Sequence, residues 1–247
     1  MPSNITNLFW GLEDKDRALS AIMDAISPLD KDGVFCGDNL IVFGRNLSFL
    51  GDEKFINAFK KIISDDNYIG YGIMWRIYFY CWCAKSSLNK KGDFVECGVS
   101  TGTSSAIMCD FLDINSHEKF LYLYDAWGSD TRVNSLAYGF NDNTYEEVKN
   151  RFSPYKNVRL IKGFVPETFS ISCPEKISFL HIDLNNADAE IAVLDALFER
   201  VIDGGLILFD DYGANGFLTS KIAEDEWMEK RGYSIMELPT GQGLLIK

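Results

Sequence analysis

The stretch DFVECGVSTGTSSAIM, residues 93–108, decides how the rest of the chain is interpreted. An apolar run ends in Glu96, Gly98 and Gly102 follow, and small hydroxyl residues lead into a second apolar run. This order predicts a buried strand, a tight turn and the start of a helix. In a parallel sheet, a turn of this kind lies at the edge where ligands bind. The stretch therefore predicts a ligand-binding turn.

Short apolar runs alternate with helical stretches from this point almost to the C-terminus. Such alternation predicts a mostly parallel sheet with helices on both faces. The chain ends differently, because the runs at 233–239 and 243–247 are joined by a turn too short for a crossover and predict an antiparallel hairpin. We therefore expect an α/β fold of the Rossmann-like class I methyltransferase type, with a mostly parallel seven-stranded sheet. Its first five strands are expected at 93–98, 120–125, 157–163, 176–183 and 204–211.

Residues 1–90 show helical spacing instead. Apolar residues recur three and four positions apart over 19–26 and 55–63, which predicts two amphipathic helices. The aromatic segment 68–84 contains a charged residue and two glycines and is too short for a membrane span, so it predicts a buried helix. We expect an N-terminal helical layer or lid at 1–90 and a methyltransferase domain at 91–247.

The composition narrows the classes of partner. The formal net charge of -12 disfavours a nucleic acid, because that affinity depends on contacts between basic side chains and phosphates. The N-terminal sequence lacks a basic region followed by an apolar one, so no signal peptide is expected and the protein is predicted to be cytoplasmic. The six cysteines include no CxxC pair and are expected to be reduced. We expect a small-molecule acceptor, and neither a nucleic acid nor a membrane as partner. A homo-oligomer formed through the aromatic N-terminal layer stays open.

Two features predict an adenosine-containing ligand at the glycine-rich turn. The N–H groups at the start of the following helix, at Thr103 to Ser105, can receive a carboxylate, and Asp125 ends the next strand, where it can accept ribose hydroxyls. The glycine spacing is GxxxG, with Ser100 where a dinucleotide fingerprint has its second glycine. Together, the helix N-terminus and Asp125 favour S-adenosylmethionine as the ligand, while the alternative that Asp125 only caps a loop stays open.

A second group of acidic residues ends two strands that are expected to be neighbours. Asp183 follows one strand, and Asp210 and Asp211 follow the other, so their carboxylates should converge at one edge of the sheet. Oxygen ligands of this kind suit Mg²⁺ or Ca²⁺. In the alternative, Asp210 caps a turn and Asp211 faces solvent. His181 lies on the same face as Asp183 and is interpreted either as a neighbour of this site or as a hydrogen-bonded core histidine.

The motifs VECGVSTGTSSA, HIDLN and LFDDYG, with DNLIVFGRNLSFL upstream, resemble the macrocin O-methyltransferase family. Members of that family methylate sugar hydroxyls of antibiotics with S-adenosylmethionine and a divalent metal. The resemblance implies that Asp183 also serves as the catalytic base. It places three groups of residues: Glu96, Gly98, Gly102, Ser104 and Ser105 around the methionine moiety; Asp125 on the ribose, with Trp127 and Gly163 near the adenine; and Asp183, Asp210 and Asp211 on the metal.

The sequence departs from this family in one motif. The common DxDLY reads Asp183-Leu184-Asn185-Asn186-Ala187 here, so the second acid and the tyrosine are missing. We expect a metal-assisted O-methyltransferase acting on a hydroxyl of a sugar or glycosylated metabolite, with the acceptor covered by the N-terminal layer and the loop 126–142. The alternatives are a nicotinamide-dependent reductase, which the missing fingerprint opposes, and a non-catalytic S-adenosylmethionine-binding protein, which has no need of three converging carboxylates.

Overall fold

The computed structural model describes residues 3–26, 33–128 and 143–247. The chain divides into two compact units, Met1–Phe79 and Tyr80–Lys247. The division of function between a lid and a catalytic domain at residue 90 stays a prediction.

The first unit contains a small three-stranded sheet that the sequence did not predict. Strand β1 (Asn4–Ile5) runs parallel to β2 (Val34–Gly37), which pairs antiparallel with β3 (Leu40–Phe43). The turn between β2 and β3 is made by Asp38 and Asn39, both with positive φ, as tight hairpins require. Strands of two to four residues are too short to show an alternating pattern, which explains why helical spacing dominated the prediction.

The remaining elements of this unit are helical, as expected. Helix α1 (Lys15–Ile26) places Ile26 against a core that also contains Phe9 and Val34. The expected helix at 68–84 is broken into two at Ile73, which is the C-cap of the first of them. The other helical elements are η1 (Ser48–Gly51), α2 (Glu53–Ile62), α3 (Tyr68–Gly72) and α4 (Met74–Ser87), and α4 continues into the second unit.

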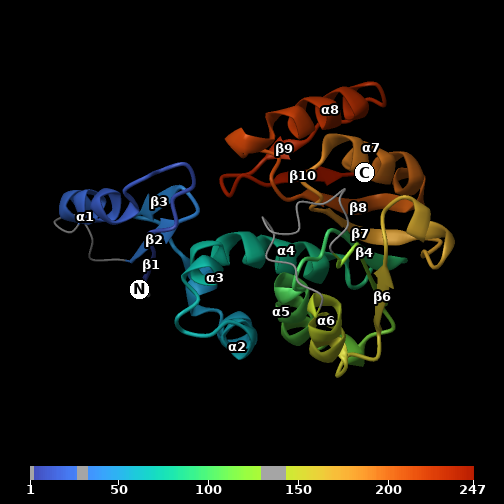
Figure 1. Ribbon diagram of the computed structural model, residues 1–247, viewed down its shortest axis with the longest axis horizontal. Coiled ribbons are helices and arrows are strands. Elements are labelled where there is room, and N and C mark those ends of the chain that lie inside the picture. The colour runs from blue at the N-terminus through green and yellow to red at the C-terminus, as the bar shows by residue number, and fades with distance from the viewer. Residues whose placement is uncertain (1–2, 27–32, 129–142) are drawn as a thin grey trace. The chain divides into compact units, whose positions relative to one another are not determined.

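The second unit is built on a seven-stranded sheet with the order β6-β5-β4-β7-β8-β10-β9 (Figure 1). Neighbouring strands from β6 to β8 are parallel, and β10 is antiparallel to both β8 and β9. The predicted fold, including the C-terminal hairpin, is confirmed. The strands are β4 (Asp93–Cys97), β5 (Leu121–Asp125), β6 (Val158–Lys162), β7 (Ile177–Ile182), β8 (Val201–Phe209), β9 (Met236–Glu237) and β10 (Gly243–Ile246).

Helices cover both faces of this sheet. Figure 1 shows α5 (Thr103–Leu112) and α6 (Thr144–Phe152) on one face, and α7 (Ala187–Leu197) and α8 (Leu218–Glu229) on the other. Apolar side chains of α7 and α8 pack with those of the central strands into one buried cluster, which fixes the strand ends that carry the acidic residues. The short 3-10 helices are η2 (Ile114–Ser116), η3 (Glu167–Ser170), η4 (Phe198–Arg200) and η5 (Asn215–Phe217).

Within the described ranges, no helix has both the length and the apolar character that crossing a bilayer demands. All six cysteines are free thiols, and Cys173 alone among them is not fully buried.

Candidate active site

The glycine-rich turn joins β4 to α5 and is packed against other parts of the second unit. Gly98 has φ +89°, and a Cβ there would lie 1.8 Å from the carbonyl oxygen of Asp183. Gly102 has φ +73°, and its Cβ would lie 2.4 Å from a ring carbon of Phe152. Both the backbone conformation and the lack of space therefore demand glycine. The close approach at Gly98 brings the end of β4 directly against the first acidic residue of the β7 end.

Asp125, at the end of β5, holds this turn in place. Its Oδ2 accepts hydrogen bonds from the N–H groups of Val99 and Ser100, both at 2.8 Å, and its Oδ1 accepts one from Trp127 at 2.9 Å. Burial raises the pKa of Asp125, and the three N–H donors act against that rise. The carboxylate is thus less free than the sequence suggested, although Oδ1 keeps a lone pair for a further donor. Its contact with a ribose stays a prediction.

Trp127 and Gly163 lie beside Asp125. The indole N–H of Trp127 donates to the carbonyl of Ser100 at 2.7 Å, and the side chain is 1% exposed. The N–H of Gly163, just past β6, donates to the carbonyl of Asp125 at 2.9 Å. Their predicted place near an adenine stays a prediction. Most of the expected lid loop, residues 129–142, lies outside the described residues.

Glu96 faces the interior of the second unit and is only 3% exposed. The hydroxyl of Tyr80 donates to its Oε2 at 2.9 Å, and the hydroxyl of Ser105 donates to the same oxygen. The other oxygen, Oε1, is 3.3 Å from Nδ1 of His181. These contacts tie the start of α5 to β4 and β7. Glu96 and Ser105 therefore support the glycine-rich turn through buried contacts, and their predicted contact with a methionine moiety stays a prediction.

His181 stands between two carboxylates. Its Nδ1 faces Glu96, and its Nε2 is 3.7 Å from Oδ1 of Asp210, an ion-pair distance longer than a hydrogen bond. Burial alone would lower the pKa of His181, but the interactions with Asp210 and Glu96 outweigh it and raise the pKa to about 10. The imidazole is therefore a buried cation at neutral pH. It agrees with the interpretation of a hydrogen-bonded core histidine that also borders the acidic site.

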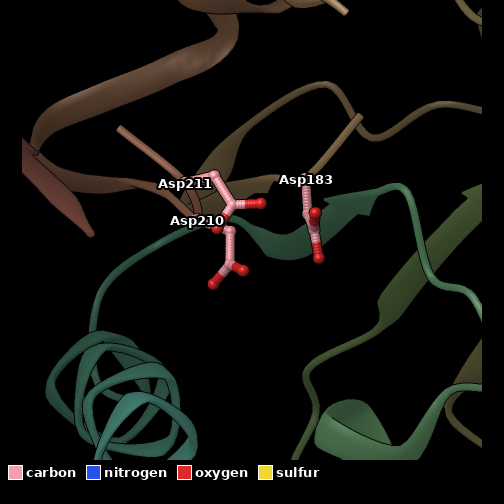
Figure 2. A group of neighbouring side chains, drawn as sticks. All are labelled: Asp183, Asp210 and Asp211. Carbon is pink, nitrogen blue, oxygen red and sulfur yellow. The ribbon is translucent and has the colours of Figure 1, made fainter. Parts of the chain in front are cut away.

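Asp183, Asp210 and Asp211 come together at the ends of β7 and β8. Figure 2 shows the three side chains at one place, with the carboxylate of Asp211 directed toward Asp183. Each offers a carboxylate oxygen within 4.8 Å of the others, and all three are half-buried. The Asp183 N–H donates to Cys97 and the Asp210 N–H donates to Ile182, so the backbone continues the strand pairing. The convergence expected from the sequence is thus present in the structure.

The environment of Asp183 favours a bound positive charge. Burial raises the pKa of Asp183 well above its usual range, the charge of Asp210 adds to the rise, and His181 opposes it. Carboxylates that crowd in this way need a proton or a cation between them. Three carboxylate oxygens are a donor set that hard divalent cations prefer, so the residues fit Mg²⁺ or Ca²⁺.

The structure adds residues that the sequence did not single out. The side chain of Gln242 is fully buried, and its Nε2 donates to Oδ1 of Asp210 at 3.1 Å. Thr240 donates to Oε1 of Gln242 at 3.0 Å, so the turn of the C-terminal hairpin reaches the acidic site. Tyr80, which binds Glu96, lies in a segment whose composition indicated only core. Nothing in the spacing of Tyr80 or Gln242 marks them, because the acids that they contact, Glu96 and Asp210, are remote in sequence.

The strand order and the C-terminal hairpin define a class I methyltransferase. The family described as Macrocin-O-methyltransferase (TylF) matches residues 84–233, more than half of the chain. The chain therefore belongs to the macrocin-O-methyltransferase family and is an S-adenosylmethionine-dependent O-methyltransferase. A comparison with curated proteins gives no match.

Solved structures of low sequence identity share the fold. The O-methyltransferase NovP has a TM-score of 0.61 at 20% identity, over 70% of this chain and 79% of that chain. CalS11, a TDP-rhamnose 3'-O-methyltransferase of calicheamicin biosynthesis, has a TM-score of 0.56 at 13% identity, over 97% of this chain and 96% of that chain. The SAH-bound methyltransferase PaMTH1 of Podospora anserina has a TM-score of 0.55 at 11% identity, over 97% of each chain.

Proposed function

We propose that this O-methyltransferase acts on a hydroxyl of a sugar or of a glycosylated small molecule, with the help of a divalent cation held by Asp183, Asp210 and Asp211. The observation that carries the proposal is the convergence of these three carboxylates next to the turn after β4. Neither a reductase nor a simple binding protein needs such a group. The sugar acceptor is supported by the family description and by the TDP-rhamnose substrate of CalS11.

The chain's own groups around the turn suit S-adenosylmethionine. The first N–H groups of α5, from Thr103 to Ser105, have no partners within the helix and carry partial positive charge, so they can receive the cofactor carboxylate. Oδ1 of Asp125 can accept one ribose hydroxyl in addition to the N–H of Trp127. When bound, the cofactor supplies an electrophilic methyl group. The full proposed set is Glu96, Gly98, Gly102, Ser104, Ser105, Asp125, Trp127 and Gly163.

The acidic site would bind and orient the acceptor. When bound, a divalent cation supplies Lewis acidity that lowers the pKa of a hydroxyl. Gln242 donates to Oδ1 of Asp210, and Nε2 of His181 lies 3.7 Å from the same oxygen, so these two contacts orient the carboxylate. We assign the proton acceptor to a carboxylate oxygen of Asp183, because Asn185 stands where the family motif has its second acid.

The test measures SAH formation from S-adenosylmethionine with a panel of nucleotide sugars and glycosides, each paired with its sugar-free counterpart. We expect turnover only with the sugar-bearing member of a pair. EDTA should abolish it and excess Mg²⁺ should restore it. Turnover that is indifferent to EDTA contradicts the cation, equal turnover of the sugar-free compounds contradicts the acceptor class, and tighter calorimetric binding of NADH than of SAH contradicts the cofactor.

A further inference from the structure

A second group of polar side chains lies next to the acidic site, between α7 and α8. Asn185, Glu190, Ser220 and Glu224 line one small cavity, and Asp183, Asp210 and Asp211 line the same cavity. The cavity offers about 10 Å³ to the centre of a water-sized sphere, which is room for a single water molecule or a single ion. All of these residues belong to the second unit.

Three oxygen atoms in this cavity lack hydrogen-bond partners among the described residues. They are Oδ1 of Asn185, Oε2 of Glu190 and Oε2 of Glu224. Glu190 is 6% exposed and Glu224 is 2% exposed, so both side chains are more than nine-tenths buried. A buried carboxylate without a partner is costly, and native proteins rarely contain one. Two of them, with an amide oxygen beside them, indicate a positively charged group that the chain itself does not provide.

The basic side chains nearby are engaged elsewhere. Within the described parts of the chain, no Lys, Arg or His lines the cavity. Lys221 on α8 pairs with Asp225 at 3.2 Å and lies 3.6 Å from the ring centroid of Tyr212. His181 is held between Glu96 and Asp210. No basic side chain among those lining the cavity therefore partners the carboxyl groups of Glu190 and Glu224, so either a cation or a proton must offset their crowding.

We propose that this cavity offers a second set of cation ligands beside Asp183, Asp210 and Asp211: the carboxylates of Glu190 and Glu224 and the amide oxygen of Asn185. Carboxylate and amide oxygens are the ligands of Ca²⁺ in proteins, and its coordination is tolerant of irregular geometry. Asn185 occupies the motif position where the family has its second acid, and it adopts a positive φ of 55° just before Asn186 caps α7. In this proposal, the change from the family's second acid to Asn185 replaces a carboxylate ligand with an amide oxygen ligand. The site does not depend on methyl transfer.

The experiment measures Ca²⁺ binding by calorimetry and thermal unfolding in the Asp210→Asn variant. Asp210 is one of the three clustered aspartates, so its replacement weakens cation binding by that cluster. Asp210 contacts Gln242 and His181, and the three proposed ligands stay intact. We expect this variant to bind one equivalent of Ca²⁺. At a hundredfold excess over Kd, Ca²⁺ should raise Tm by roughly 5–10 °C.

Adding Glu224→Gln or Glu190→Gln to that variant should weaken Ca²⁺ binding at least about tenfold and remove the rise in Tm, because each removes a ligand charge. In EDTA these variants should unfold at the same or a higher temperature, since a crowded carboxyl group is replaced by a neutral amide of the same size, so loss of binding is not loss of folding. Glu226→Gln is the matched control, on the same helix but with a side chain 65% exposed, and should bind Ca²⁺ normally. No binding to Asp210→Asn, or binding unchanged by both glutamine variants, overturns the site and leaves a shared proton between the glutamates.

Discussion

The carboxylates at the end of β5 and at the ends of β7 and β8 occupy equivalent positions in the sheet but are balanced in different ways. Asp125 accepts three backbone N–H groups, so its charge is met by the chain itself. Asp183, Asp210 and Asp211 face one another, and His181, which lies beside Asp210, is shared with Glu96. The comparison teaches that a strand-terminal acid with backbone donors shapes a loop, whereas carboxylates that face one another are arranged as ligands that suit a cation.

The largest effect is expected where the two regions meet, at Gly98. A Cβ at this position would overlap the carbonyl oxygen of Asp183, and its φ of +89° is unfavourable for alanine. Gly98→Ala should therefore lower the free energy of unfolding by roughly 2–4 kcal/mol. Gly204→Ala is the control, because its φ is also positive and nothing lies within 4 Å of its Cβ. If denaturant unfolding shows equal losses for both, the close approach of β4 and β7 is not what demands glycine.

A smaller effect is expected at Asp125. Asp125→Ala removes both the proposed ribose contact and the acceptor that orders Val99 and Ser100. It should weaken SAH binding by about 1–3 kcal/mol, through the loss of charge-assisted hydrogen bonds. Calorimetry checks this, with Mg²⁺ binding expected to stay unchanged. An unaltered SAH affinity would show that Asp125 serves the loop alone.

A further effect concerns the pH dependence of stability and the cavity beside the acidic site. Burial raises the pKa of Glu224 to about 9, the charges of Glu190 on α7 and Asp225 on α8 add to the rise, and Lys221 opposes it. The unfolded chain loses this proton near the ordinary glutamate pKa of 4.5, while the folded chain keeps it. In EDTA, stability should therefore fall as pH rises between these values, by up to about 1.4 kcal/mol per pH unit from this group.

Glu224→Gln should remove that part of the slope, measured as unfolding free energy at pH 6 and pH 8 in EDTA. The exposed-site variant Glu226→Gln should keep it. Identical slopes in the parent and in Glu224→Gln would mean that Glu224 is ionised in the folded protein, which would contradict the expectation that it keeps its proton.

The order of the strands and the meeting of the three aspartates were predictable, because each strand carries its own apolar pattern and parallel neighbours end at the same edge. The partners of those acids were not predictable. The N–H groups of Val99 and Ser100 on Asp125, the hydroxyl of Tyr80 on Glu96 and the amide of Gln242 on Asp210 join residues remote in sequence, without any periodic signal. The strands of the first unit were missed because they are too short to alternate visibly.

The central claim is that the acidic edge holds a cation while the turn after β4 holds the cofactor, and Asp210→Asn tests it most directly. The variant is compared with Asp203→Asn, whose residue is exposed at the other end of β8. Methyl transfer, Mg²⁺ affinity and SAH affinity are measured on both. The account predicts that Asp210→Asn lowers transfer and Mg²⁺ affinity about a hundredfold or more while SAH affinity stays within about twofold, and that Asp203→Asn changes nothing. Undiminished transfer by Asp210→Asn in the presence of EDTA would contradict the claim.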